Sequence, residues 1–227
     1  MTQNEMRRYI YRQIQSIYGL TATDEEYVEK YFDEAVLRTL ECFSHIKNKY
    51  YAPNKINFYH SGQYLIFLYY LSNSIYKNEI ENRVDYLDYR TNARMICDKL
   101  YCLNKLMSSC ELYYEVELPK FFFAEHPLGS VIGRAKIGKG FCFMQSCTVG
   151  NNAGFYPIIG EYVFMYSGAK ILGNAHIGNR VLIAANAYIK DQDVPDDVIV
   201  FGASPNLIIK KNYLKKIKGM IMEQFCL

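Results

Sequence analysis

One segment of the sequence, residues 131–189, repeats its apolar residues with a period of six. Two phased series carry the repeat: Val131, Ile137, Phe143 and Val149, then Ile159, Met165, Ile171, Ile177, Ile183 and Ile189. An α-helix has about 3.6 residues per turn and a strand alternates every two, so neither element produces this spacing. A solenoid with three six-residue sides per turn does produce it. A hexapeptide period is typical of a parallel β-helix.

The repeat is interrupted once. Val149 and Ile159 lie ten positions apart instead of six, so four extra residues within 150–158 must leave the solenoid as a loop. Loops on a rigid scaffold commonly carry binding and catalytic residues. Before the repeat, we expect residues 111–130 to form a first, irregular coil.

The first 110 residues are predicted to be helical. Apolar side chains recur at helical spacing at about residues 6–17, 23–47, 61–77 and 85–108. We interpret Thr23 and Glu26 as a capping box at the start of the second helix. The third segment is apolar on nearly every side, which indicates a helix buried between its neighbours. The sequence therefore predicts an α+β chain: a helical domain (1–110), a parallel β-helix domain (111–205) and a C-terminal tail (206–227) that is also helical.

Composition argues against several classes of function. A formal net charge of +3 over 227 residues is too small to favour nucleic-acid binding. The longest apolar run, Tyr64 to Leu71, has eight residues, whereas a membrane-spanning helix needs roughly 20. Seven cysteines without a C-x-x-C pair are typical of free thiols in a reducing cytoplasm, where we expect the protein to be located. The repeat region holds too few histidines for a three-histidine zinc site, so no metal is expected.

Several segments resemble the serine acetyltransferase family of hexapeptide-repeat acyltransferases. The resemblance is carried by FMQSCTVGN (143–151), residues 166–197 and FGASPNLIIKK (201–211). Upstream, EHPLGSVIG (125–133) is similar to the family's DHATGVVIG, and YHSGQY (59–64) resembles its FHAxQAYR. The resemblance implies a left-handed β-helix, acetyl-CoA as the donor, and homotrimers with each active site between two subunits. In some members of the family the trimers pair through their helical domains.

The same resemblance implies that His126 is the general base, which takes the proton of an acceptor hydroxyl as its oxygen attacks a thioester. In the family an aspartate fifteen residues earlier orients this histidine, and Glu111 occupies the matching position. Glu125 replaces a second aspartate that helps to bind the acceptor. Either glutamate could instead be an exposed salt-bridge partner. The other histidines, His45, His60 and His176, are interpreted as packed or solvated side chains.

The interrupting loop bears on the identity of the acceptor. The family's loop carries an Arg-His-Pro sequence that binds the serine carboxylate, whereas this chain has Phe155-Tyr156-Pro157 in a shorter loop. Losing both cations removes charge-assisted contacts to a carboxylate, and Tyr156 offers a hydroxyl and an aromatic face that suit a sugar. We therefore expect a carbohydrate hydroxyl, as in a surface polysaccharide, to be the acceptor. The alternatives are serine O-acetylation in cysteine biosynthesis and a non-catalytic trimeric scaffold.

The resemblance also implies where coenzyme A would lie. In the family its pantetheine arm follows a groove along consecutive coils, at positions where the side chains are small. The matching positions here are Ser167, Gly168, Ala185 and Asn186, with Gly150 and Asn151 nearer the thioester and Lys190 and Lys210 nearer the phosphates. Backbone N–H groups at these positions could stabilise an oxyanion. For each lysine the alternative is an ordinary surface residue.

Overall fold

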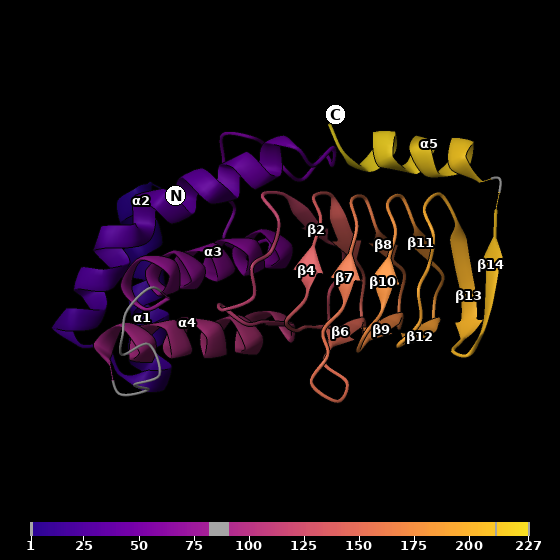
Figure 1. Ribbon diagram of the computed structural model, residues 1–227. Helices are drawn as coiled ribbons and strands as arrows, with labels where there is room; N and C mark the ends of the chain where they lie inside the picture. Colours follow the sequence, from indigo (N-terminus) through magenta and orange to yellow (C-terminus); the bar gives the residue numbers. More distant parts are fainter. Residues whose placement is uncertain (1, 82–90, 212, 227) are drawn as a thin grey trace.

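The computed structural model describes residues 2–81, 91–211 and 213–226. Helices occupy one end of the molecule, a β-solenoid occupies the other, and a last helix runs back along the solenoid (Figure 1). The predicted α+β architecture, with helices followed by a parallel solenoid of six-residue sides, is confirmed. In the described part of the chain, no helix combines the length and apolar character that crossing a membrane would require.

The helical part centres on a buried helix. It consists of α1 (Gln3–Tyr18), α2 (Ala22–Ser44), α3 (Ser61–Glu79) and α4 (Asn92–Ser108). In α3, 16 of 19 residues are buried, because α2 and α4 pack against it. This confirms the interpretation of an all-round apolar segment as a buried helix. The first residues of the predicted fourth helix, 85–90, lie outside the described part of the chain.

The start of α2 differs from the prediction. Thr21, not Thr23, is the N-cap: its hydroxyl accepts a hydrogen bond from the Asp24 amide (3.2 Å), and the Asp24 carboxylate accepts one from the Thr21 amide (2.8 Å). The Thr-x-x-acid pattern therefore applies two residues earlier than predicted, which leaves Thr23 within the first turn. Lys99 binds the same carboxylate at 2.7 Å and so anchors this cap to α4.

Replacing the cap residue provides a test of this assignment. We expect Thr21→Ala to lower the free energy of unfolding by about 1 kcal/mol, because the Asp24 amide loses its acceptor. The matched control, Thr23→Ala, should change it by less than about 0.5 kcal/mol. Urea unfolding followed by circular dichroism measures both variants, and an equal effect of the two would contradict the capping geometry.

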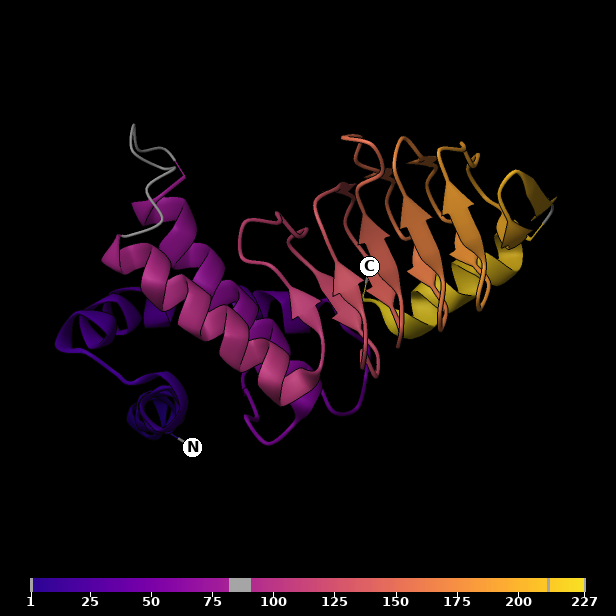
Figure 2. The same cartoon turned by 90° about the horizontal axis from the view of Figure 1, so that it is seen from below.

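The solenoid has three faces of parallel strands, seen from two sides in Figure 1 and Figure 2. The first face comprises β1 (Glu111–Leu112), β3 (Val131–Ile132), β6 (Thr148–Gly150), β9 (Lys170–Leu172) and β12 (Tyr188–Lys190). The second face comprises β4 (Lys136–Ile137), β7 (Ile158–Ile159) and β10 (His176–Ile177). The third face comprises β2 (Phe122–Ala124), β5 (Phe141–Phe143), β8 (Phe164–Met165), β11 (Leu182–Ile183) and β13 (Ile199–Ala203).

The repeat positions face the interior with one exception. Val149 aligns with Ile171 and Ile189, and Phe143 aligns with Met165, all of them buried. Val131, however, is 37% exposed, and the fully buried Ile132 aligns with Val149 instead. Val131 therefore belongs to the six-residue series in the sequence but faces outward in the structure. A one-residue shift in a strand exchanges the two faces, and this shift occurs where the irregular first coil joins the regular ones.

The interruption of the repeat forms a loop, as predicted. The strands on either side stay in register, since Ile137 pairs with Ile159 and Val149 with Ile171. The extra residues project from the solenoid between β6 and β7 (Figure 1). Asn152 and Phe155 close the loop through two reciprocal backbone hydrogen bonds of 3.1 and 3.0 Å.

The tail contains a strand before its helix. Residues Asn206–Lys210 form β14, which pairs antiparallel with β13, so the prediction of helix from residue 206 is wrong for this part. The helix α5 (Leu214–Gln224) then runs back along the solenoid (Figure 1). Its end joins the helical part, because the Cys226 amide donates to the His45 carbonyl and the Lys47 amide to the Gln224 carbonyl, each at 2.8 Å.

Candidate active site

His126 lies in a corner between two faces of the first coil. From Ala124 to Ile132 this corner spans eight positions, whereas the corner stacked on it spans six, because Ala124 aligns with Phe143 and Ile132 with Val149. The expansion holds the exposed His126 at φ +49°. Other corner residues of the solenoid, such as Ser146 and Asn186, share this left-handed conformation. The backbone thus presents this imidazole at the edge of the solenoid.

A small cavity opens in front of His126, between the first coil, the start of α3 and the segment before it. Its volume is about 130 Å³. The lining residues are Asn48, Tyr50, Tyr51, His60, Ser61, Gly62, Phe123, Ala124, Glu125, His126 and Pro127. Two of the predicted site residues, His126 and Glu125, therefore share one cavity. Its other wall comes from the helical part, about 65 residues earlier in the chain.

His60 is a residue of this cavity that sequence reasoning assigned to packing. It is the N-cap of α3, and its Nδ1 accepts a hydrogen bond from the Gln63 amide at 3.4 Å. The ring packs against those of Tyr50 and Tyr51, with centroid distances of 5.8 and 5.4 Å. Burial lowers the pKa of His60, and the nearby His126 lowers it further. The resemblance at residues 59–64 was the one sequence feature that pointed to this position.

Glu111 lies next to the His126 corner but binds another partner. Its amide donates to the Ser130 carbonyl at 2.8 Å, which places it at the same edge of the solenoid. Its carboxylate accepts from Lys105 at 2.8 Å. Within residues 2–81, 91–211 and 213–226, the His126 ring has no hydrogen-bond partner. In the single chain, then, Glu111 is the salt-bridge partner that the sequence left open as an alternative.

Four of the predicted coenzyme positions form a row below the His126 corner. The Ser146 amide donates to Leu128, the Gly168 amide to Gln145 and the Asn186 amide to Ser167, at 2.8, 2.9 and 2.9 Å. These bonds stack Ser167, Gly168, Ala185 and Asn186 along one edge. A Cβ added at Gly168 would collide with Asn186 Oδ1, so the Asn186 side chain would have to move. The edge carries small side chains next to the candidate base.

The remaining predicted coenzyme positions lie away from this edge of the chain. Gly150 ends β6 and Lys190 ends β12, at the far side of the first face from His126. Asn151 and the exposed Tyr156 belong to the projecting loop, and Asn152 of that loop donates to Asp191 at 2.6 Å. Lys210 ends β14 and pairs with Ile199 at the start of the third face. The structure therefore divides the predicted site among three edges.

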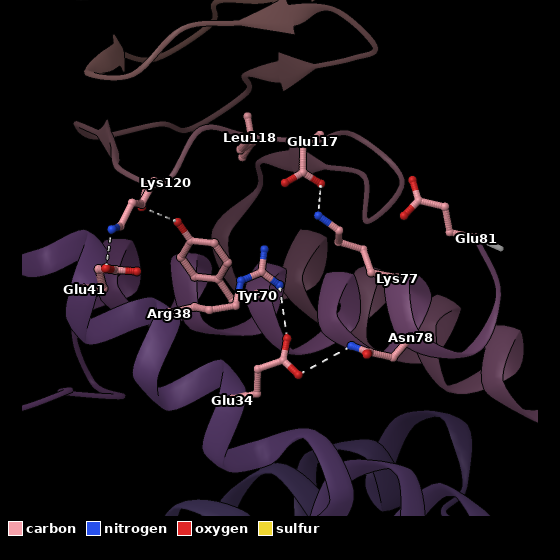
Figure 3. Close-up of a pocket in the computed structure, with 10 residues that line it drawn as sticks. All are labelled: Glu34, Arg38, Glu41, Tyr70, Lys77, Asn78, Glu81, Glu117, Leu118 and Lys120. Atoms are coloured by element: carbon pink, nitrogen blue, oxygen red, sulfur yellow. Dashed lines mark hydrogen bonds and ion pairs between the residues drawn. The ribbon is translucent and has the colours of Figure 1, made fainter.

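A larger cavity, about 490 Å³, lies between α2, α3 and residues 117–120 (Figure 3). Its charged groups bind one another: Lys77 pairs with Glu117 at 3.0 Å and Lys120 with Glu41 at 2.6 Å. None of the predicted site residues lines it. We therefore place the candidate site in the smaller cavity, where the histidines lie. Across the part of the chain that the structure describes, no group of three His, Cys, Asp or Glu side chains could hold a metal ion.

Comparisons with known proteins agree with the repeat. Residues 156–191 match the family model described as bacterial transferase hexapeptide (six repeats). The chain is 30% identical over 134 residues to the serine acetyltransferase of Synechococcus elongatus. The match covers 57% of this chain and 54% of that relative, so the chain spans about half of the relative's length.

Solved structures share the fold. The serine acetyltransferase of Brucella abortus in complex with coenzyme A superimposes with a TM-score of 0.62 at 18% identity, covering 93% of this chain and 83% of that one. Isoform 3 from Entamoeba histolytica in complex with cysteine gives 0.59 at 22% identity, covering 95% and 76%. The helical part followed by the solenoid is thus shared over nearly the whole described chain. Together with the repeat, these similarities show the fold of a helical part followed by a hexapeptide-repeat solenoid, and the curated relatives that the chain resembles are serine acetyltransferases.

Proposed function

We propose that the protein is an acetyl-CoA-dependent O-acetyltransferase in which His126 is the general base. The observation that carries this proposal is the position of His126: an expanded corner presents its imidazole to a cavity, at the same edge as a row of small residues. The Brucella abortus relative was solved with coenzyme A, which supports the same donor here.

In the proposed reaction the acceptor hydroxyl lies in the cavity and His126 removes its proton. The acceptor oxygen forms a bond to the thioester carbon, and the negative charge moves to the carbonyl oxygen. When the tetrahedral intermediate collapses, the carbon–sulfur bond breaks and the histidine returns the proton to the leaving thiolate. General-base catalysis of this kind contributes typically about 10² to 10⁴ in rate. Backbone N–H groups of the adjoining corners would stabilise the oxyanion.

Assembly of copies would complete the coenzyme site. The row Ser167, Gly168, Ala185 and Asn186 lies on the His126 edge, whereas Gly150, Asn151, Tyr156 and Lys190 lie on another edge. We infer that one edge of each subunit faces the other edge of its neighbour in a homotrimer. Glu111 would act on His126 only after its salt bridge to Lys105 breaks. Contact with a neighbouring subunit or with substrate would let Glu111 exchange Lys105 for His126 as its partner.

L-Serine is the first acceptor that we propose, because the relatives described above are serine acetyltransferases. Glu125 in the cavity offers a carboxylate for the amino group of such an acceptor. A carbohydrate hydroxyl is the second candidate. It is favoured by one observation: the projecting loop carries exposed Phe155 and Tyr156 and contains no lysine or arginine between Gly150 and Ile158.

Release of free thiol from acetyl-CoA distinguishes these candidates. The assay would be run with L-serine and then with a panel of monosaccharides and oligosaccharides. Turnover with L-serine supports serine O-acetylation, and turnover with sugars alone supports the carbohydrate acceptor. Coenzyme A binding without thiol release in any of these reactions would contradict the proposal of an enzyme and support the scaffold.

A further inference from the structure

Two histidines face one cavity, although only one of them is needed as a base. His60 and His126 come from different parts of the fold and both line the cavity of about 130 Å³. Sites for drug-sized ligands occupy about 300–1,000 Å³, so this space suits a small acceptor, or the single unit of a larger one that carries the reacting hydroxyl. A group that occupies it lies beside both histidines.

The orientation of His60 determines which hydrogen bond its ring can offer. Its Nδ1 accepts the hydrogen bond of the Gln63 amide, so in the neutral ring the proton is on Nε2. The aromatic rings of Tyr50 and Tyr51 hold the imidazole from two sides. Gly62 allows Tyr51 and His60 to pack closely, because a Cβ at position 62 would lie 2.7 Å from the Tyr51 hydroxyl and 3.5 Å from His60 Cε1. The ring is therefore a fixed hydrogen-bond donor.

The charge state of His60 matters for its neighbour. Burial lowers the pKa of His60, and the proximity of His126 acts in the same direction. A neutral His60 does not repel the imidazolium that forms on His126 when the latter takes the acceptor proton. It can therefore remain a donor throughout the reaction without opposing the base.

We propose that His60 is an acceptor-binding residue: its Nε2–H donates a hydrogen bond to a second oxygen of the acceptor and so orients the reacting hydroxyl toward His126. The acceptor class is a small molecule or sugar unit with an oxygen next to the reacting hydroxyl, either a carboxylate or a further hydroxyl. This inference rests on the proposed acetyl transfer and adds a specificity-determining residue to the same site.

Variants that keep the helix cap test the proposal. Asparagine and serine are favoured N-cap residues, so His60→Asn and His60→Ser preserve the start of α3 but cannot reach the acceptor. We expect kcat/KM for the acceptor to fall about tenfold, because a lost hydrogen bond of about 1.4 kcal/mol corresponds to that factor. KM for acetyl-CoA and the unfolding midpoint should not change. His176→Asn, a surface histidine on the second face, is the matched control.

The acceptors used identify the oxygen that His60 binds. The probes are L-serine, serinol, which lacks the carboxylate, and D-glucose. A tenfold loss with L-serine alone assigns the contact to the carboxylate. Equal losses with L-serine and serinol show that His60 donates to either a carboxylate or a hydroxyl oxygen at that position, and a loss with D-glucose assigns the contact to a hydroxyl. Unchanged acceptor kcat/KM in both His60 variants overturns the inference, as does a loss shared equally by acetyl-CoA and acceptor. If His126→Asn also keeps its activity, the proposed function itself fails; if only the His60 variants do, the base assignment survives.

Discussion

Replacing His126 by asparagine is expected to lower the rate of acetyl transfer by a factor of about 10² to 10⁴, the usual contribution of a positioned general base. The acceptor hydroxyl is a poor nucleophile while it keeps its proton, and we assign its removal to no other side chain. Asparagine is chosen because it tolerates the left-handed backbone of this corner (φ +49°) better than most residues. Free-thiol release under saturating acetyl-CoA measures the effect.

The corner itself provides the control for this variant. Leu128 lies two residues away and is exposed, so Leu128→Ala should leave both turnover and stability nearly unchanged. Coenzyme A binding by His126→Asn should match that of the unaltered protein, because the row of small residues is untouched. Turnover above half of the unaltered rate would mean that another group removes the proton.

The second large effect concerns the C-terminal tail. We expect Phe225→Ala to lower the free energy of unfolding by about 3–4 kcal/mol, within the range for loss of a buried phenylalanine. Phe225 is 1% exposed, and its ring lies 5.6 Å from that of Phe121, 6.1 Å from Tyr162 and 6.0 Å from Phe164. The substitution leaves a cavity where α5 joins both the first coil and the helical part.

Met222 gives the matched comparison for Phe225. It lies in the last turn of α5, which Phe225 follows, but is 59% exposed, so Met222→Ala should change stability by less than about 0.5 kcal/mol. Urea unfolding with a constant m-value measures the pair. A loss below about 1 kcal/mol for Phe225→Ala would show that the tail contributes little to the folded state.

The solenoid was predictable from the sequence because its period is set by geometry that every coil repeats. Inward positions such as Ile171 and Ile183 follow directly from the six-residue period, and the loop follows from the interruption of that period. Val131 departs from the inward positions because the first coil lacks a preceding regular coil to set its register. The strand β14 was mispredicted because its pairing with β13 depends on a tertiary neighbour that local pattern does not reveal.

The candidate site was predictable only in part. The resemblance pointed to His126. The cavity beside it exists because the start of α3 packs near the first coil, and no spacing in the sequence predicts that contact. His60 was therefore assigned to packing. Glu111 shows the reverse case. The resemblance implied its position at the His126 edge, but its carboxylate binds Lys105, which lies in the last turn of α4.

The path of α5 links the height of the solenoid to the length of the helix, which are otherwise independent. Neighbouring coils lie about 4.8 Å apart, whereas a helix advances about 1.5 Å per residue. The helix leaves the last coil and ends against the first coil and His45. Inserting one extra coil would therefore separate these anchors unless α5 also gained about three residues. Among related chains with the same returning helix, we expect solenoids of different height to differ in helix length in this ratio.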